Sequence, residues 1–230
     1  MNDVSNKTIV ALLAVALVVS IAGTLYSVSE LNDLGGTYML LTGAATDSGT
    51  ATITIQGTAD VTVTDAAIAF GTGYVNASCA DGEAWISSDG EGSGCWLNTS
   101  GEVPAATDDS HTVENNGTTS TTLSVTLSDT DAEAFLCEAV GGCTGSTTAA
   151  VYVKAEDGGD GEAGACSSGL NTTYESIATH DATTSQQLCA QFNPEAATDV
   201  LEVNYNLTLP PDMPQGLKTG TVTYTATAVS

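Results

Sequence analysis

The C-terminal stretch Val200 to Val229 reads VLEVNYNLTLPPDMPQGLKTGTVTYTATAV, and it decides the fold class. On both sides of its centre, apolar residues alternate with Thr, Asn or Glu, which is the two-residue period of a half-buried β-strand. The centre, Pro210 to Gly216, contains three prolines, and proline cannot donate to a β-ladder. The stretch therefore predicts two strands separated by a turn, and it favours an all-β body.

Shorter stretches upstream repeat this alternation. Thr50 to Ile55 (TATITI) and Asp60 to Thr64 (DVTVT) alternate apolar residues with polar ones. Two further strands are expected at Ala67 to Phe70 and at Ala149 to Val153. The abundance of Thr, Val and Gly agrees with short strands joined by turns.

The stretch His111 to Ser128 (HTVENNGTTSTTLSVTLS) predicts a β-hairpin. Its Asn116-Gly117 pair supplies the positive φ angles that a tight two-residue turn requires. Ser128 and Asp131 then have the spacing of a capping box. The short helix expected after them carries the apolar residues Ala132, Phe135 and Leu136.

The composition excludes one class of partner and suggests an environment. The 230 residues carry 28 Asp and Glu against three Lys, a formal net charge of −25. Lys7, Lys154 and Lys218 cannot form a basic patch, so no nucleic acid is expected as a partner. Because only 13% of residues are charged and 42% are apolar, the chain is expected to fold. At about 1 M salt the screening length falls to roughly 3 Å and self-repulsion largely disappears. The acidity thus resembles that of a salt-adapted exterior protein, the alternative being an acidic cell-wall protein at moderate salt.

The run Thr8 to Tyr26 (TIVALLAVALVVSIAGTLY) has no charge. As a helix it would be roughly 28 Å long, close to the thickness of a bilayer core. The alternative is a secretory signal peptide cleaved before Gly23, because small residues precede that position. The run is longer than the usual apolar region of a signal peptide, which favours a retained helix. Lys7 places the N-terminus in the cytoplasm.

The apolar run continues as an amphipathic stem that ends at Gly35-Gly36. An uncharged N-terminal helix with such a stem before a Thr-rich β head resembles an archaeal type IV pilin-like subunit. The run differs from prepilin-type signals in having no Gly before a cleavage point after Lys7 and no early Glu. Small residues at four-residue spacing form a stripe suited to packing against a neighbouring helix, namely Ala16, Ser20 and Thr24. A plain anchor in lipid, with Ala as a common residue of any span, is the alternative.

Six cysteines form an even set in a chain with an export signal, for which disulfides are the default state. We expect sequence neighbours to pair, each pair closing one inserted loop: Cys79 with Cys95, Cys137 with Cys143, and Cys166 with Cys189. Zinc is disfavoured because no C-x₂-C pair occurs. Five N-x-[ST] sequons beyond the apolar run are candidate glycosylation sites at surface turns: Asn76, Asn98, Asn116, Asn171 and Asn206.

Catalytic motifs are missing from the sequence. H-E-x-x-H, G-x-S-x-G and GxxxxGK[ST] do not occur, so no enzymatic activity and no catalytic residues are expected. No cofactor is expected either. Three acidic loops, EDGGDGE, SDTDAE and SDGEG, have the oxygen-rich composition that Ca²⁺ prefers, although none has EF-hand spacing. A solvated acidic surface is the simpler interpretation of these loops.

The C-terminal strands and the Asn116-Gly117 turn look like the immunoglobulin-like β-sandwich modules of archaeal and bacterial surface proteins. This resemblance implies a mainly β fold, an immunoglobulin-like β-sandwich after an N-terminal apolar helix, with disulfide-stapled insertions around Cys79 to Cys95 and Asp157 to Cys189. Turn chemistry carries the resemblance, so it transfers no active site. The expected organisation is a cytoplasmic N-terminus (1–7), a transmembrane or filament-core helix with stem (8–34), a linker (35–49) and an exterior β-sandwich domain (50–230).

These features predict a structural protein of the cell surface. The first hypothesis is a pilin-like subunit that contacts the membrane through its helix before assembly and then self-associates into a filament. The second is a membrane-anchored monomeric adhesin whose head binds a glycan or another cell. The two differ in whether the helix is bundled with other helices or is solitary in lipid.

Overall fold

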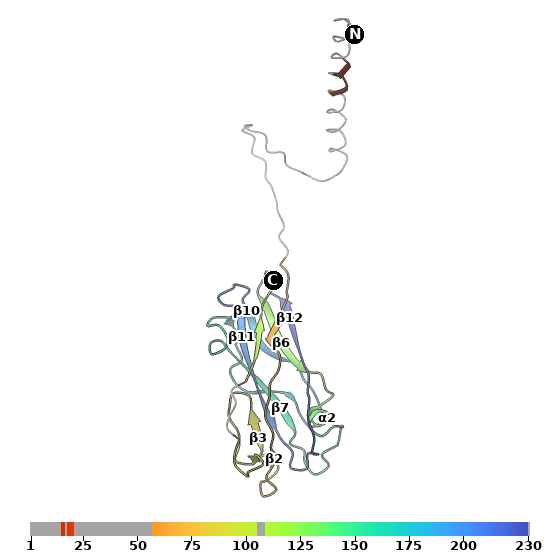
Figure 1. The fold of residues 1–230 in the computed structure, drawn as a ribbon, viewed down its shortest axis with the longest axis vertical. Helices are drawn as coiled ribbons and strands as arrows, with labels where there is room; N and C mark the ends of the chain where they lie inside the picture. Colours follow the sequence, from red (N-terminus) through yellow and green to blue (C-terminus); the bar gives the residue numbers. More distant parts are fainter. Residues whose placement is uncertain (1–14, 17, 21–56, 105–108, 230) are drawn as a thin grey trace, which may run out of the picture. The chain divides into compact units, whose positions relative to one another are not determined.

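The computed structural model describes residues 15, 16, 18–20, 57–104 and 109–229 (Figure 1). The chain divides into two compact units, residues 1–53 and 54–230. In the first unit Val15, Ala16, Val18, Val19 and Ser20 are helical. Within the described part of the chain, no helix reaches the length and hydropathy that a membrane crossing requires. The rest of the predicted 8–34 helix, the 35–49 linker and the predicted strand at 50–55 lie outside the described residues.

The second unit is mainly β, and all of its named strand pairs are antiparallel. Its largest sheet has six strands in the order β1-β5-β11-β7-β9, with β3 also pairing with β11. The bounds are β1 Thr62–Asp65, β3 Trp85–Ser87, β5 His111–Glu114, β7 Ala150–Glu156, β9 Glu175–Ala178 and β11 Val200–Thr208. One side of β11 pairs with β7, and the other side pairs first with β5 and then with β3.

A second sheet has four strands in the order β12-β6-β10-β8. Their bounds are β6 Thr121–Leu127, β8 Cys166–Ser168, β10 Gln186–Phe192 and β12 Val222–Ala228. Two short strands, β2 Tyr74–Val75 and β4 Trp96–Leu97, form a small sheet of their own. One helix of five residues, α2 Ala132–Leu136, follows β6.

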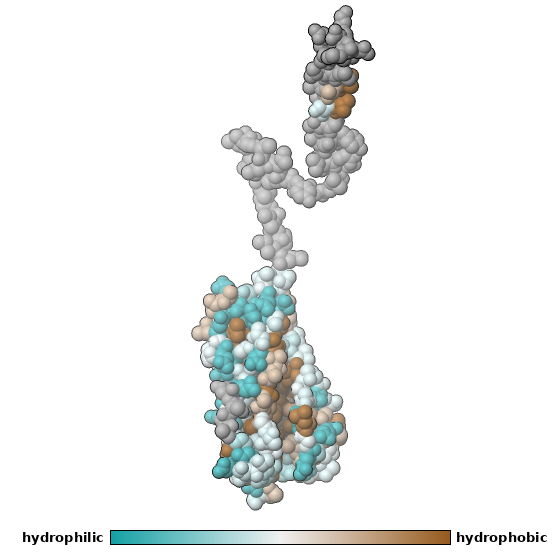
Figure 2. Space-filling view, viewed as in Figure 1, coloured by the Kyte–Doolittle hydropathy of each residue, from teal (hydrophilic) through white to brown (hydrophobic). Residues whose placement is uncertain are grey.

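The two larger sheets pack against each other, with β10 lying against β7 and β9 and β6 against β9. β6 shows why this packing follows from the sequence, because its odd-numbered residues from Thr121 to Leu127 are buried while those between them are not. The shared core is aliphatic, with Phe192 the largest fully buried side chain. On the face seen in Figure 2, apolar residues in brown gather along the middle of the head, with hydrophilic residues in teal to both sides.

The predicted hairpin at Asn116-Gly117 is wrong, although both of its strands exist. β5 belongs to the six-stranded sheet and β6 to the four-stranded sheet, so the chain between them passes from one sheet to the other. Buried Asn115 holds this crossing, because its Nδ2 donates to the carbonyl of Phe192 at 2.9 Å and its Oδ1 accepts from the N–H of Gly117 at 3.1 Å. These side-chain bonds replace the two-residue turn that local sequence favoured.

Two other local predictions need correction. Ala67 to Phe70 forms no strand, because the N–H of Ala69 donates to the side chain of Asp109 at 2.8 Å instead of to a neighbouring strand. The helix α2 begins at the predicted place but with a different cap. Asp131 is the N-cap and accepts from the N–H of Ala134 at 2.6 Å, whereas the N–H of Ser128 donates to Thr221 as a continuation of the β6–β12 ladder.

The C-terminal strands occur where the alternation predicts them. β12 has the alternating burial of a half-buried strand, but β11 does not. β11 is buried on both faces over Leu201 to Tyr205. On its outer face, Ser88 donates to the Asn204 side chain at 3.0 Å and the N–H of Asp160 donates to Glu202 at 3.1 Å, so two loops cover these polar side chains. The turn at Pro210 to Gly216 lies between β11 and β12, which belong to opposite sheets. The segment 157–189 is likewise part of both sheets, not an insertion, because it contributes β8 to one and β9 to the other.

Candidate functional site

All six cysteines lie in the described part of the chain and none is free. The predicted neighbour pairing is confirmed, with disulfides Cys79–Cys95, Cys137–Cys143 and Cys166–Cys189. The third bridge joins the paired strands β8 and β10 and does not close an inserted loop. With every thiol oxidised, no cysteine is available as a zinc ligand or a nucleophile.

The five sequons occupy different environments. Asn116 is exposed, and Asn76 and Asn98 lie half-buried where side-chain oxygens accept from nearby backbone N–H groups. Asn206 lies inside β11 between β3 and β7, so it does not mark a surface turn. The amide nitrogen of Asn171 is buried and has no hydrogen-bond partner among the described residues. Three of the five asparagines, Asn76, Asn98 and Asn116, therefore lie in loops, and the Nδ2 of Asn116 donates to the hydroxyl of Thr62 at 2.9 Å.

The acidic loops use their carboxylates as acceptors for backbone groups. Asp131 caps α2, the side chain of Asp157 accepts from the N–H of Gly164 at 3.2 Å, and the side chain of Glu162 accepts from the N–H of Asp199 at 2.9 Å. Burial, together with nearby Glu162, raises the pKa of the Asp199 carboxyl. The first and last of these loops, EDGGDGE and SDGEG, meet at Lys154, where Asp89 and Glu156 both pair with the lysine ammonium, so a cation of the protein already lies between their carboxylates.

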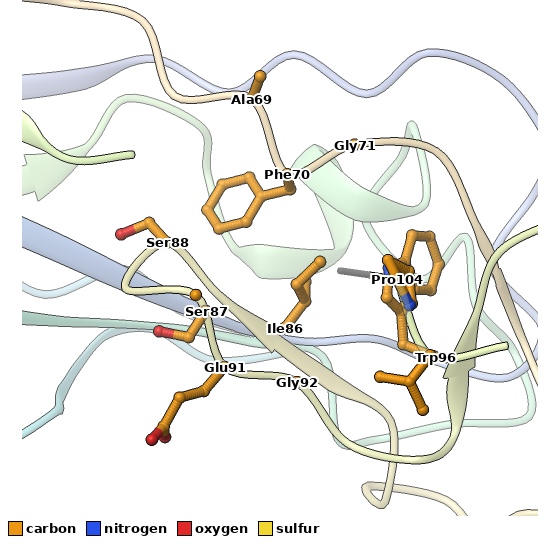
Figure 3. A pocket seen from close by; sticks show the side chains of 12 residues that line it. Ala69, Phe70, Gly71, Ile86, Ser87, Ser88, Glu91, Gly92, Trp96 and Pro104 are labelled. Atoms are coloured by element: carbon orange, nitrogen blue, oxygen red, sulfur yellow. The ribbon is translucent and has the colours of Figure 1, made fainter. Parts of the chain in front are cut away.

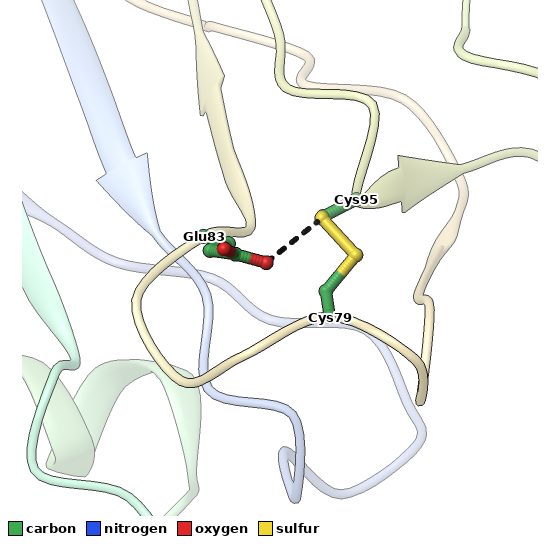
Figure 4. Close-up of side chains that lie close together, drawn as sticks. All are labelled: Cys79, Glu83 and Cys95. Carbon is green, nitrogen blue, oxygen red and sulfur yellow. Dashed lines mark hydrogen bonds between the residues drawn. A yellow bond between two sulfur atoms is a disulfide. The ribbon is translucent and has the colours of Figure 1, made fainter.

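Among the described residues, one group of three potential ligand side chains lies close together: Cys79, Glu83 and Cys95 (Figure 4). Its two sulfurs form a disulfide, so they offer no thiolate to a metal. The Glu83 carboxylate lies 3.8 Å from the Cys95 sulfur and accepts from the N–H of Ala80 at 2.9 Å. The group therefore closes a turn and is not a metal centre.

A cavity of about 160 Å³ lies where β3, β4 and the 69–71 segment meet. Phe70 and Ile86 extend toward one another across it, and Trp96 lies beside Pro104 (Figure 3). Ser87, Ser88 and Glu91 supply its polar lining. The indole N–H of Trp96 is buried and has no partner among the described residues. An apolar floor with a few polar groups is the usual lining of a ligand pocket, but this volume is below the roughly 300 Å³ common for drug-sized ligands.

A polar cluster adjoins the cavity at Ser87. The ammonium of Lys154 pairs with Asp89 at 2.7 Å and with Glu156 at 2.6 Å, and it lies 4.9 Å from the centre of the Tyr174 ring. Burial lowers the pKa of Lys154, but the hydrogen bonds to these two carboxylates outweigh it and raise that pKa overall. The lysine is therefore a charged, structural partner of two acids and not a neutral nucleophile.

His111 joins the two sheets. Its Nδ1 lies 2.9 Å from the hydroxyl of Tyr224 on β12, and that hydroxyl lies 2.6 Å from the hydroxyl of Tyr205 on β11. Burial lowers the pKa of His111, while the charges of Asp65 and Asp109 act against this lowering. The neutral imidazole is therefore the form that the folded head stabilises.

The lowered pKa of His111 predicts a loss of stability in mild acid. The stabilisation is fully present above the unfolded pKa of about 6.5, and it is lost as the pH falls through the lower folded pKa, because the unfolded chain binds the proton first. Thermal melts should give a Tm that falls between pH 7 and about pH 5.5, and His111→Gln should flatten this fall. His180→Gln is the matched control and should keep the wild-type pH dependence. A wild-type slope in His111→Gln would contradict the assignment.

Of the predicted helix-packing residues, Ala16 and Ser20 are helical and four positions apart, and Thr24 lies outside the described residues. Sequence reasoning did not find the cavity, which loops and short strands form within residues 69–104. It also did not find the Lys154 cluster, whose residues come from distant parts of the chain. One signal was present for the cluster: Lys154 stands inside the otherwise apolar and strongly strand-forming AVYVKAE. No protein-family model, curated protein or solved structure matches this chain.

Proposed function

We propose that this protein is a structural subunit of the cell surface, a pilin-like subunit that assembles into a filament through its N-terminal helix and carries an immunoglobulin-like β-sandwich head outside the cell. The observation that carries the proposal is the pairing of all six cysteines in a chain whose residues 8–26 form a long uncharged apolar run. Disulfides persist in oxidising exterior compartments and are rare where thiols are kept reduced. An exported head on a membrane helix therefore accounts for both features.

The helix supports self-association because of its small residues. Ala16 and Ser20 are helical and lie one turn apart, so they share one face of the helix. Small residues on one face allow the backbones of two helices to approach closely. Bulky residues such as Leu13 and Leu17 supply the apolar surface that keeps the helix in a lipid or filament core.

The double variant Ala16→Leu/Ser20→Leu tests the proposal. The variant keeps the apolarity that membrane insertion needs, but it places bulky side chains on the helix face that carries the small residues. Filaments or oligomers should therefore be lost while the head is still displayed at the surface. Electron microscopy of the cell surface with an antibody to the head measures both. The matched control, Val15→Leu/Val18→Leu, keeps the apolarity and adds bulk on the side of the helix away from Ala16 and Ser20, so it should leave assembly in place. Unchanged assembly in the first variant would rule out the helix as the assembling element.

A monomeric adhesin is the second candidate, and the cavity beside Trp96 favours it. Aromatic and aliphatic walls next to Ser87 and Glu91 suit a small ligand with both apolar and hydroxyl faces. Under this alternative, oligosaccharides bind the full chain, no filament forms, and the helix serves only as an anchor.

A further inference from the structure

The four-stranded sheet has no charged residue in any of its strands. β6, β8, β10 and β12 read TTLSVTL, CSS, QQLCAQF and VTYTATA. Every strand of the six-stranded sheet except β3 carries at least one charged residue or His. In a chain with a net charge of −25, this sheet is the place where a second copy of the protein can approach with least repulsion.

The edge strands of the two sheets differ in how well they are protected. β1 and β9 are interrupted by register shifts and carry Asp65 and Glu175. β8 has three residues and is tied to β10 by a disulfide. β12 has seven residues in unbroken register with β6, no charge and no proline, and among the described residues it pairs with β6 alone. Over its described residues, it therefore lacks the short length, charge, proline and bulge that commonly block pairing between sheet edges.

The register of β12 shows which backbone groups are free. The carbonyl of Thr221 accepts from Ser128, and the N–H of Val229 donates to Ser120, so the odd-numbered residues of this strand bond to β6. In an antiparallel ladder, the even-numbered residues then direct their N–H and C=O groups to the open side. These residues are Val222, Tyr224, Ala226 and Ala228.

We propose that β12 pairs antiparallel with β12 of a second copy across a two-fold axis at Thr225, which joins two four-stranded sheets into one. In this register Tyr224 lies opposite Ala226 of the second copy. The backbone N–H and C=O groups of the four even-numbered residues in each copy then form hydrogen bonds with those of the other copy. Thr223, Thr225 and Thr227 are exposed on the outer face, and they form Thr–Thr pairs across the axis. The contact needs only the head, so it stands independently of the helix.

Cysteine cross-linking in the full chain tests this contact. Thr225→Cys places two thiols opposite each other in a non-hydrogen-bonded pair, where the Cα atoms lie at about 4.5 Å, within reach of a disulfide. The matched control is Ser124→Cys, because Ser124 pairs with Thr225 on the same face. Its symmetry mate would lie three strand spacings away, roughly 14 Å, which is too far. In detergent at about 1 M NaCl, Thr225→Cys should form linked dimers at least about tenfold faster than Ser124→Cys.

A second variant separates edge pairing from chance collision. Ala226→Pro removes an N–H that points to the open side, so it leaves the β6 ladder intact and blocks the second copy. Added to Thr225→Cys, it should lower the cross-linking rate to that of Ser124→Cys while the Tm stays close to that of the parent. The Ala16→Leu/Ser20→Leu background should not change the ratio between Thr225→Cys and Ser124→Cys, which distinguishes this contact from association through the helix.

Three results would overturn the proposal. The first is equal cross-linking of Thr225→Cys and Ser124→Cys, and the second is a rate that Ala226→Pro does not lower. The third is protection of the Tyr224 and Ala226 amides from hydrogen exchange in a protein that does not cross-link. That result would assign the edge to another strand, for which the alternating segment Thr50 to Ile55 is the first choice.

Discussion

Replacing Cys166 and Cys189 together by alanine is expected to lower the free energy of unfolding by about 3 kcal/mol, the value for a closed loop of this length. The structure adds a second reason for a large effect. Both sulfurs are buried, and the bridge holds the three-residue strand β8 against β10. For a chain of this size the loss corresponds to a fall in Tm of roughly 6 to 12 °C.

Denaturation of the full chain at fixed salt measures this effect. The matched control, Cys137→Ala/Cys143→Ala, removes a bridge that closes only six positions, for which about 2 kcal/mol is expected. The first double variant should therefore be the less stable of the two. If it were the more stable, the sheet would hold β8 without the disulfide.

Raising NaCl from about 0.1 M to about 1 M is expected to raise the Tm of the head by roughly 10 °C, which corresponds to about 3 kcal/mol of relieved repulsion. The reason is the distribution of charge. Residues 54–230 contain 24 of the 28 acidic residues but only two lysines, Lys154 and Lys218. Both lysines are already held in ion pairs with Asp or Glu. Residues 54–230 contain no other lysine and no arginine to offset the remaining acids, so screening must come mainly from the solvent.

Asp199→Asn supplies the matched variant for the salt experiment. Burial and nearby Glu162 raise the pKa of Asp199, so the ionised carboxylate opposes folding at neutral pH and its protonated form favours folding in acid. The variant should have a higher Tm than the parent at pH 7 in low salt, and added NaCl should raise its Tm by less than it raises that of the parent. A parent Tm that moves by less than about 1 °C over the salt range would show that the acidity does not limit stability.

Much of the architecture was predictable from local patterns. The alternation at Val200 to Val229, the proline turn within it and the strand near Ala149 all correspond to strands or turns in the structure. The neighbour pairing of the cysteines was also correct. These features depend on the two-residue period of a strand and on short separations along the chain, which a sequence displays directly.

The sequence by itself therefore determined a mainly β, disulfide-linked, strongly acidic chain with an apolar run at residues 8–26. Only the tertiary structure decided which sheet each strand joins, because an alternating pattern has the same period in either sheet. β5 and β6 lie in opposite sheets, and the connection between them is held by the hydrogen bond from Asn115 to the carbonyl of Phe192, 77 positions away. The Lys154 cluster and the open edge of β12 likewise depend on strands brought together from distant parts of the chain. Such contacts leave no local period, so a lysine inside the strand-forming AVYVKAE marks one residue of the cluster, but its partners are found only once the sheets are assembled.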